Sequence, residues 1–228
     1  MSVKAVRSFH FNQHTWDLLV LGEGVFLLKA QDATLDNLKD ASDWVGAALG
    51  EYLEDQVPAY QSITLFTRLS IEQVALRLNM TQKTVSRQSE SRKAIDIPIC
   101  YELGPDLSIV AKGVGLSENA LIEAHLKAPY QTAFIGFTPG FLYLTGLPSA
   151  LSFPRKATPR RMVEVGSVGI GGSQAGIYSL PSPGGWNIIG RTPQKLFDKE
   201  KIPPIKLSIG TSIQFKRISM TEFEQWES

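Results

Sequence analysis

GSVGIGGSQAGIYSLPSPGGWNIIGRTP, which runs from Gly166 to Pro193, alternates short apolar runs with glycine and proline. Short strands separated by regularly spaced turn residues are typical of an all-β barrel or sandwich. The same pattern of short apolar runs between turn residues begins after Pro129 and continues through SIQFKRI, which ends at Ile218. This part of the chain is therefore predicted to form a mainly β domain.

The end of the quoted stretch carries residues that a simple turn does not need. Gly184 and Gly185 lack Cβ atoms, so a ligand or a neighbouring strand can approach the backbone closely. Trp186 would then offer an apolar wall, and Arg191 a planar fork suited to a carboxylate or phosphate. A structural alternative stays open, in which Trp186 plugs the end of a barrel and Arg191 pairs with an acid such as Asp198.

The first part of the chain mixes strands and helices. The segment Leu18–Leu28 predicts two strands joined by a Gly-Glu-Gly turn. Thr34 is placed to cap a helix, SITLFTRL predicts another strand, and Ser70 with Gln73 predicts a capping box that opens a second helix. We expect a small N-terminal α/β domain of the ferredoxin-like kind.

A polar stretch without periodicity, RQSESRKA, separates the mixed α/β pattern from the mainly β pattern and marks a domain boundary. The expected domains are residues 1–92 and residues 93–228, which makes the fold class α+β. After the boundary, IDIPICYEL predicts a strand. Ser117 then caps a short helix with Leu121 and Ile122 on one face.

Composition limits the classes of protein that the chain can belong to. The 228 residues carry a formal net charge of +1, which argues against a nonspecific binder of polyanions. Cys100 is the only cysteine, so no intrachain disulfide can form and a reducing compartment is expected. The N-terminus lacks a continuous apolar stretch typical of a signal peptide. We expect a cytoplasmic protein that binds neither membrane nor nucleic acid.

One segment resembles a helix-turn-helix. In IEQVALRLNMTQKTVSR, Asn79 occupies the turn position, and Lys83 and Arg87 would lie on the recognition helix. The motif is preceded by a strand and followed by a polar linker, without the third helix that DNA binding requires. We therefore favour an ordinary amphipathic helix that buries Val74 and Leu78.

Four motifs together resemble one family: GFTPGFLYLTGLP, PRKATPR, GSVGIGGSQAGIY and PGGWNIIGRTP. They look like the family formed by the B subunits of prokaryotic ATP-dependent 5-oxoprolinases. The same family includes the Kip-type inhibitor of a sporulation histidine kinase and subunit 1 of allophanate hydrolase, a module also found in urea carboxylases. The resemblance is close from Ile95 to about Phe215. Lys156 departs from it, because relatives usually carry arginine there.

The resemblance implies a cyclophilin-like β-barrel as the C-terminal domain. It implies partners homologous to the C and A subunits of that enzyme, and together these would use ATP to convert 5-oxoproline to glutamate. Inhibition of a histidine kinase, or a role in a urea carboxylase or allophanate hydrolase, are the alternatives. The sequence has no Walker A pattern, so we expect ATP to be shared with the partner subunits and the chain to be inactive alone.

The expected site combines residues of the motifs with one histidine outside them. His125 is a candidate proton shuttle, although a capping or core role is also open. Arg160 matches the family's cation, against the alternative of a solvated pair with Arg161. No metal site is expected. The candidate catalytic residues are His125, Arg160, Gln174 and Arg191; the candidate substrate-binding residues are Phe137, Pro139, Gly140, Tyr143, Tyr178, Gly184, Gly185 and Trp186.

Other roles stay open for several of these residues. Gln174 and Tyr178 are placed either to hydrogen-bond a ligand or to satisfy buried backbone groups in a bulged strand. Phe137 and Tyr143, with Phe141 between them, form either a wall against a partner subunit or part of the barrel core.

Overall fold

The computed structural model describes residues 6–30, 32–81, 94–201, 203–205 and 207–226. The chain divides into two compact units, Met1–Ser91 and Arg92–Ser228. The expected boundary between residues 92 and 93 lies outside the described residues. No helix of the described part is both long enough and apolar enough to cross a bilayer.

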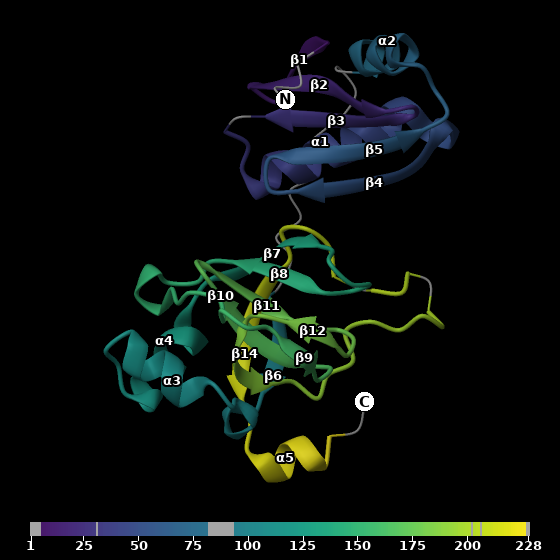
Figure 1. The fold of residues 1–228 in the computed structure, drawn as a ribbon. Coiled ribbons are helices and arrows are strands. Elements are labelled where there is room, and N and C mark those ends of the chain that lie inside the picture. The colour runs from purple at the N-terminus through teal and green to yellow at the C-terminus, as the bar shows by residue number, and fades with distance from the viewer. Residues whose placement is uncertain (1–5, 31, 82–93, 202, 206, 227–228) are drawn as a thin grey trace. The chain divides into compact units, whose positions relative to one another are not determined.

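The N-terminal unit is one antiparallel sheet with two helices (Figure 1). The sheet order is β1-β2-β3-β5-β4. Helix α1 begins at the capping box formed by Thr34 and Asn37, as the Thr34 cap predicts. The elements are β1 (Arg7–Phe11), β2 (His14–Gly22), β3 (Val25–Ala30), α1 (Leu35–Leu49), a 3-10 turn (Gly50–Tyr52), β4 (Leu53–Ala59), β5 (Ser62–Thr67) and α2 (Ile71–Thr81).

The ferredoxin-like expectation for this unit is not confirmed. A ferredoxin-like domain has the order β-α-β-β-α-β, whereas three strands precede the first helix here. The physical reason is the additional hairpin β1–β2. It places Trp16 and Leu18 in the core, where Trp44 of α1 also lies and stacks on Phe11 with a ring separation of 4.5 Å.

The helix-turn-helix candidate is helical through its expected turn. Helix α2 continues past Asn79 to Thr81, and Val74 and Leu78 are buried as an amphipathic helix requires. The hydrogen bonds between Ser70 and Gln73 confirm the predicted capping box. The proposed recognition residues, from Gln82 to Arg87, lie outside the described residues.

The C-terminal unit is built on a seven-stranded sheet that curls almost into a barrel (Figure 1). Its order is β13-β10-β11-β8-β7-β14-β6, and only β6 and β14 pair in parallel. The elements are β6 (Ile95–Ile99), α3 (Leu107–Gly113), α4 (Glu118–Lys127), β7 (Tyr130–Ile135), β8 (Leu142–Thr145), β9 (Arg160–Val163), β10 (Ser167–Gly171), β11 (Gln174–Ile177), β12 (Ser182–Gly184), β13 (Asn187–Arg191), β14 (Ser212–Arg217) and α5 (Met220–Glu224), with 3-10 turns at Tyr101–Leu103 and Ser149–Leu151.

The two edges of this sheet meet at one bridge. Cys100 follows β6, Arg191 ends β13, and each backbone amide donates to the other residue's carbonyl at 2.9 Å. The main core lies on one face of the sheet and includes residues of β6, β7, β8, β10, β11, β13 and β14 together with α3 and α4. The α+β class with a mainly β second unit is confirmed, while the name cyclophilin-like stays a prediction.

The alternation along the strands places the candidate site on the opposite face of the sheet. A smaller cluster there contains Phe141, Tyr178 and Trp186, with Tyr143 packed against it. The ribbon formed by β9 and β12 pairs Arg160 with Gly184 beside this cluster. The residues of the main core on the neighbouring strands are Leu142, Leu144, Val168, Ile170, Ala175 and Ile177.

A glycine allows the segment before α3 to lie against β13. A Cβ atom at Gly104 would approach the carbonyl carbon and oxygen of Ile189 to 2.2 Å. Gly104→Ala should therefore lower the free energy of unfolding of the C-terminal unit by about 1–3 kcal/mol, because the backbone of β13 must shift. Urea unfolding of the purified protein would measure the loss.

Gly136→Ala is the matched control for this substitution. A Cβ atom at Gly136 meets nothing nearer than Phe134, at 3.6 Å, which is ordinary contact. Its free energy of unfolding should stay within about 0.5 kcal/mol of the parent protein. Equal stability of the two variants would contradict the packing argument.

Candidate functional site

Asp106 lies at the centre of a cluster of charges in the C-terminal unit. Its side chain is 2% exposed, yet it contacts two cations. Oδ1 accepts hydrogen bonds from Lys156 Nζ at 3.1 Å and from Arg160 Nη2 at 2.7 Å. Oδ2 accepts from the backbone amide of Ile188 at 2.7 Å. Both oxygens of this carboxylate are therefore directed towards β9, β13 and the segment before β9.

Asp106 occupies the N-cap position of α3 without acting as a side-chain cap. An aspartate there usually accepts a hydrogen bond from the first turn of its helix. Here its carboxylate contacts other elements instead, while its backbone amide donates to the Ile188 carbonyl at 2.9 Å. Burial raises the pKa of Asp106, but the hydrogen bonds from Arg160, Ile188 and Lys156 outweigh burial and leave the pKa below its usual value. The carboxylate is thus ionised at neutral pH.

The segment that carries Lys156 is hydrogen-bonded to β13 and to the residues just before that strand. The Lys156 amide donates to the Gly185 carbonyl at 2.7 Å, and the Asn187 side-chain amide donates to the Pro154 carbonyl at 2.8 Å. Arg160 then pairs with Gly184 across the β9–β12 ribbon. Candidate residues Arg160, Gly184 and Gly185 are therefore brought together, as the motifs suggest.

Trp186 is packed down onto glycines of the sheet. A Cβ atom at Gly171 would approach its ring to 2.7 Å, and one at Gly176 would approach it to 2.9 Å. The ring is also edge-on to Phe141, with centroids 5.6 Å apart, and lies 5.7 Å from Tyr143. Only 5% of Trp186 is exposed. The residue therefore supports the site from beneath rather than forming an open wall.

Two further groups complete the surroundings of Trp186. The guanidinium of Arg155 lies over its ring at 5.3 Å, which is a cation–π contact. Tyr178 is buried, and a Cβ atom at Gly184 would come within 2.2 Å of its hydroxyl. Burial raises the pKa of Tyr178, whereas the hydrogen bond from the Trp186 backbone and the charges of Arg155 and Arg160 act in the opposite direction. The cations thus lie near this hydroxyl.

The loop between β7 and β8 places an aromatic side chain in solvent. Phe137 is 62% exposed and has a φ of 70°, a left-handed conformation that costs energy for a bulky residue. Its ring is edge-on to Phe141 at 5.5 Å. The Pro139 carbonyl accepts from the Ser179 hydroxyl at 2.6 Å, and Gly140 leaves room for the ring of Phe197. The loop therefore borders the aromatic cluster.

His125 lies in the core, away from this cluster. It is 0% exposed on α4, and its Nδ1 atom is 2.7 Å from the Tyr101 hydroxyl. The rings of Tyr130 and Phe215 pack against it at 5.1 and 4.7 Å. Burial lowers the pKa of His125 to about 3, so the imidazole is neutral at physiological pH. The structure favours the core interpretation over the catalytic one.

Arg191 also lies away from the charged cluster, at the far end of β13 from Trp186. Its Nε atom donates to the Val165 carbonyl at 2.7 Å, and its Nη2 atom is 3.9 Å from Glu164. The acid beside Arg191 is thus Glu164 and not Asp198, which instead forms ion pairs with Lys195 at 3.2 Å and Lys201 at 3.4 Å. Arg191 thus braces the loop between β9 and β10.

Gln174 begins β11, on the same strand as the glycine beneath Trp186. The two-residue alternation puts Gln174 and Gly176 on one face, and Ala175 and Ile177 on the core face. Gln174 therefore shares the outer face with the aromatic cluster, and its side chain is half-buried.

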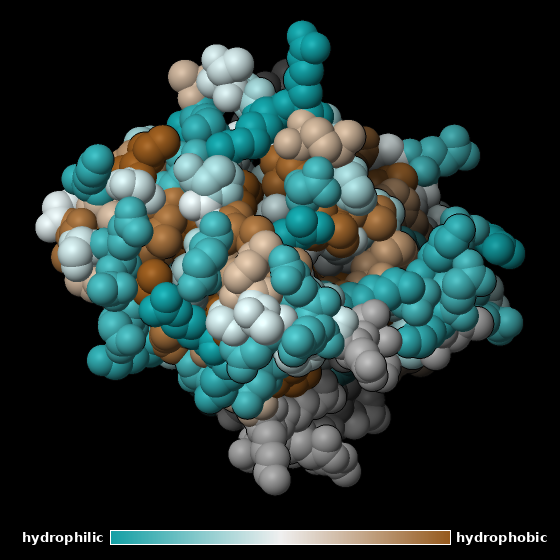
Figure 2. Space-filling view, turned by 90° about the horizontal axis from the view of Figure 1, so that it is seen from below, coloured by the Kyte–Doolittle hydropathy of each residue, from teal (hydrophilic) through white to brown (hydrophobic). Residues whose placement is uncertain are grey.

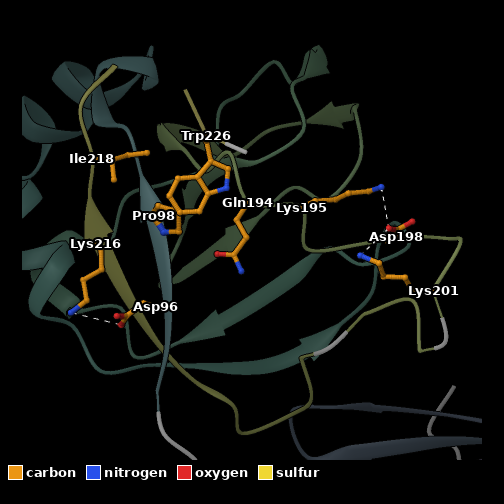
Figure 3. Close-up of a pocket in the computed structure, with 9 residues that line it drawn as sticks. All are labelled: Asp96, Pro98, Gln194, Lys195, Asp198, Lys201, Lys216, Ile218 and Trp226. Atoms are coloured by element: carbon orange, nitrogen blue, oxygen red, sulfur yellow. Dashed lines mark ion pairs between the residues drawn. The ribbon is translucent and has the colours of Figure 1, made fainter. Parts of the chain in front are cut away.

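A separate open groove of about 640 Å³ lies beside β6 and β14 (Figure 3). The ion pair of Lys216 with Asp96 lies on one side, and Asp198 with its two lysines on the other. Trp226 and Pro98 also line the groove. Figure 2, which looks from below, shows patches of apolar surface separated by hydrophilic side chains. The groove contains none of the candidate site residues.

Within the described residues, no group of three or more His, Cys, Asp or Glu side chains is arranged to hold a metal ion. Two of the donors in the Asp106 cluster, those of Lys156 and Arg160, are positively charged nitrogens, which suit an anion instead. This cluster is therefore the chemically distinctive feature of the outer face.

Residues 16–207 match a family described as carboxyltransferase domain, subdomain C and D. This match spans most of both units, so the chain belongs to a class of carboxyltransferase-type domains. Three similar proteins are all named as the B subunit of 5-oxoprolinase. The chain belongs to this family of 5-oxoprolinase B subunits.

The relatives are similar over most of their length. The protein from Escherichia coli O157:H7 is 41% identical over 167 residues, which are 71% of this chain and 76% of that protein. The protein from Bacillus subtilis (strain 168) is 34% identical over 204 residues, 79% of this chain and 85% of that protein.

Solved structures agree on the fold. TTHA0988 has a TM-score of 0.75 and 33% identity over 86% of this chain, which matches 40% of that longer chain. A conserved uncharacterized protein from Pyrococcus horikoshii has a TM-score of 0.56 and 36% identity over 90% of this chain and 99% of its own. The urea carboxylase of Kluyveromyces lactis has a TM-score of 0.72 at 15% identity over 96% of this chain and 23% of its own, which shows a common fold alone.

Sequence reasoning missed Asp106, Lys156 and Arg155 as members of the site. Asp106 stands in the motif GPDL, far along the chain from the cations that it binds. A signal was present, because an aspartate between a proline and an apolar residue is a conspicuous N-cap. Nothing local to the sequence says that its carboxylate turns away from the helix.

Asp106→Asn should lower the free energy of unfolding at pH 7 by about 2–3 kcal/mol, because two cations lose their buried counter-charge. The pKa of Asp106 is depressed in the folded protein, so its stabilisation is full above the unfolded pKa of about 3.9 and is lost as the pH falls below that value. Urea unfolding at several pH values would measure both effects.

Asp96→Asn is the control for Asp106→Asn, since Asp96 is exposed and lies 3.7 Å from Lys216. It should change the free energy of unfolding by less than about 1 kcal/mol. A similar loss for both aspartates would contradict the buried-cluster argument.

The buried His125 should make the stability of the fold sensitive to acid at a higher pH than Asp106 does. His125 has a pKa of about 3 in the folded protein and about 6.5 in an unfolded chain. The unfolded state therefore takes up the proton first, and stability falls as the pH drops below about 6.5. Between pH 7 and pH 5 the loss should be about 2 kcal/mol.

His125→Gln keeps an acceptor for Tyr101 but cannot titrate. The slope of unfolding free energy against pH between pH 7 and pH 5 should flatten in this variant, and remain in a control that replaces the more exposed His14 with Gln. An unchanged slope in His125→Gln would show that His125 is not the titrating group.

Proposed function

We propose that this chain is one subunit of an ATP-dependent 5-oxoprolinase, which converts 5-oxoproline to glutamate together with homologues of the C and A subunits. The observation that carries the proposal is the similarity, over most of the chain, to proteins named as the B subunit of 5-oxoprolinase. A cationic cluster on the outer face of the sheet supports it, because 5-oxoproline carries a carboxylate.

The chemistry explains why ATP would be needed. The ring amide of 5-oxoproline is stable, and phosphorylation of the ring oxygen would activate its carbonyl carbon for attack by water. The sequence has no Walker A pattern, so we assign nucleotide binding to the assembled complex rather than to this chain alone. In this arrangement the chain contributes residues that bind and orient the substrate.

The alternatives have less support. Likeness to urea carboxylase is likeness of fold, and fold does not fix function. Inhibition of a histidine kinase would use a surface such as the exposed Phe137, and that residue fits equally a contact with a partner subunit. We propose the cyclophilin-like barrel as the platform for assembly in either case.

The test is reconstitution of the complex. The purified chain alone should release no glutamate from 5-oxoproline in the presence of ATP, and activity should appear when homologues of the C and A subunits are added. Omission of ATP should abolish the activity. Glutamate release by the chain alone would show that it does not need partner subunits. Failure of the complete set of subunits to release glutamate would contradict the proposed function.

A further inference from the structure

The charges around Asp106 do not balance. Lys156 and Arg160 both bind its Oδ1 atom, and the Ile188 amide binds Oδ2. Across the described part of the chain, neither cation forms an ion pair with a second carboxylate. The trio therefore carries one uncompensated positive charge, although a purely structural ion pair would need only one cation.

Arg160 also has a donor that the protein leaves unused. Its Nη1 atom is shielded from solvent and makes no hydrogen bond with any described residue. Buried donors in folded proteins are nearly always paired, so this atom calls for an acceptor. The whole side chain is 27% exposed, as is that of Lys156, so both side chains lie partly at the surface.

Asp106 holds these cations at a fixed position relative to β13. Its own backbone amide and its Oδ2 atom both bind Ile188, in two hydrogen bonds of 2.9 and 2.7 Å. Lys156 is held by its backbone amide to Gly185 as well as by its ammonium group. A site whose donors are locked before the ligand arrives binds without the cost of ordering them.

We infer that Arg160 and Lys156 form a subsite for one oxyanion, and that Asp106 is the positioning residue that orients the Arg160 guanidinium towards it. The choice of ligand rests on the proposed function, which makes the carboxylate of 5-oxoproline the expected occupant. A phosphate group offers the same oxyanion chemistry. A single negative charge on the ligand would neutralise the trio.

The binding test uses the purified full-length chain and calorimetric titration. The probes are 5-oxoproline, inorganic phosphate, and the neutral lactam of the same ring without its carboxylate. At least one anion should bind, and the neutral lactam should bind more weakly than 5-oxoproline or not at all. Preference for 5-oxoproline identifies a carboxylate subsite, and preference for phosphate identifies a phosphate subsite.

Neighbouring arginines give a matched pair of variants. Arg160→Ala should weaken binding of the preferred anion by about ten-fold or more, the range for a lost charge-assisted hydrogen bond. Arg161→Ala removes the same charge from the adjacent exposed position and should leave the affinity within about two-fold, as expected for a screened surface charge. Arg160→Lys, which keeps the charge without the fork, should give an intermediate affinity.

Asp106→Asn separates positioning from simple electrostatics. Removal of the carboxylate makes the subsite more positive, so electrostatics alone predicts tighter binding of an anion. Positioning predicts weaker binding in spite of the added positive charge, because Arg160 loses the partner that orients it. The titration is made at a temperature at which the variant is folded by circular dichroism.

Three results would overturn the inference: no binding of either anion at millimolar concentrations, equal loss in Arg160→Ala and Arg161→Ala, or tighter binding in Asp106→Asn. The last would remove the positioning role. The proposed function fails separately, when the reconstituted complex releases no glutamate from 5-oxoproline although an anion still binds the chain through Arg160.

Discussion

The outer site depends on one buried carboxylate that joins three parts of the C-terminal unit. Asp106 connects the start of α3 to β13 through Ile188 and to the strand and segment that carry Arg160 and Lys156. Removing an ion from water is costly, so a buried aspartate persists only where several donors replace its hydration. The close approach permitted by Gly104 is what brings this carboxylate within reach of β13.

The aromatic cluster depends on a different constraint, which is the space that the large ring of Trp186 needs on a tightly packed sheet. Trp186 fits because the strands beneath it carry Gly171 and Gly176, whose missing side chains leave the required volume. The glycines before Trp186 have different roles: Gly184 makes room for the Tyr178 hydroxyl, whereas Gly185 contributes its carbonyl to hold Lys156. The motif is therefore a packing device that also fixes the cations.

Local patterns predicted the local features of this chain well. The caps at Thr34, Ser70 and Ser117 and the hairpin turn at Gly22–Gly24 follow from side-chain hydrogen bonding and backbone freedom within a few residues. The departure from the ferredoxin-like order was not predicted, because the turn of the β1–β2 hairpin at Asn12 and Gln13 carries neither glycine nor proline, although both residues have positive φ. Similarly, no local pattern separates His125 in a core from a histidine in a site.

The motifs located the candidate site only in part. Arg160, Gly184, Gly185 and Trp186 come together because they share a β-ribbon and its continuation. Arg191 belongs to the same motif, but the length of β13 carries it to the other end of the strand. Asp106, which pairs with Lys156 and Arg160, belongs to a separate motif. Only the folded chain shows that its carboxylate reaches these two cations.

The parallel pairing of β6 with β14 has a consequence for how this unit is made. β6 is the first strand of the barrel-like sheet along the chain and β14 is the last, so the first strand has no parallel neighbour until synthesis of the unit is nearly complete. Pairings between distant segments form slowly, because the entropy of closing a long loop is lost before the contacts are gained. During synthesis the antiparallel strands between them can pair with their neighbours. Until β14 is made, β6 keeps an unpaired edge. The bridge between Cys100 and Arg191 cannot form before β13 is made. Such an edge is where a nascent chain is most exposed to pairing with other chains.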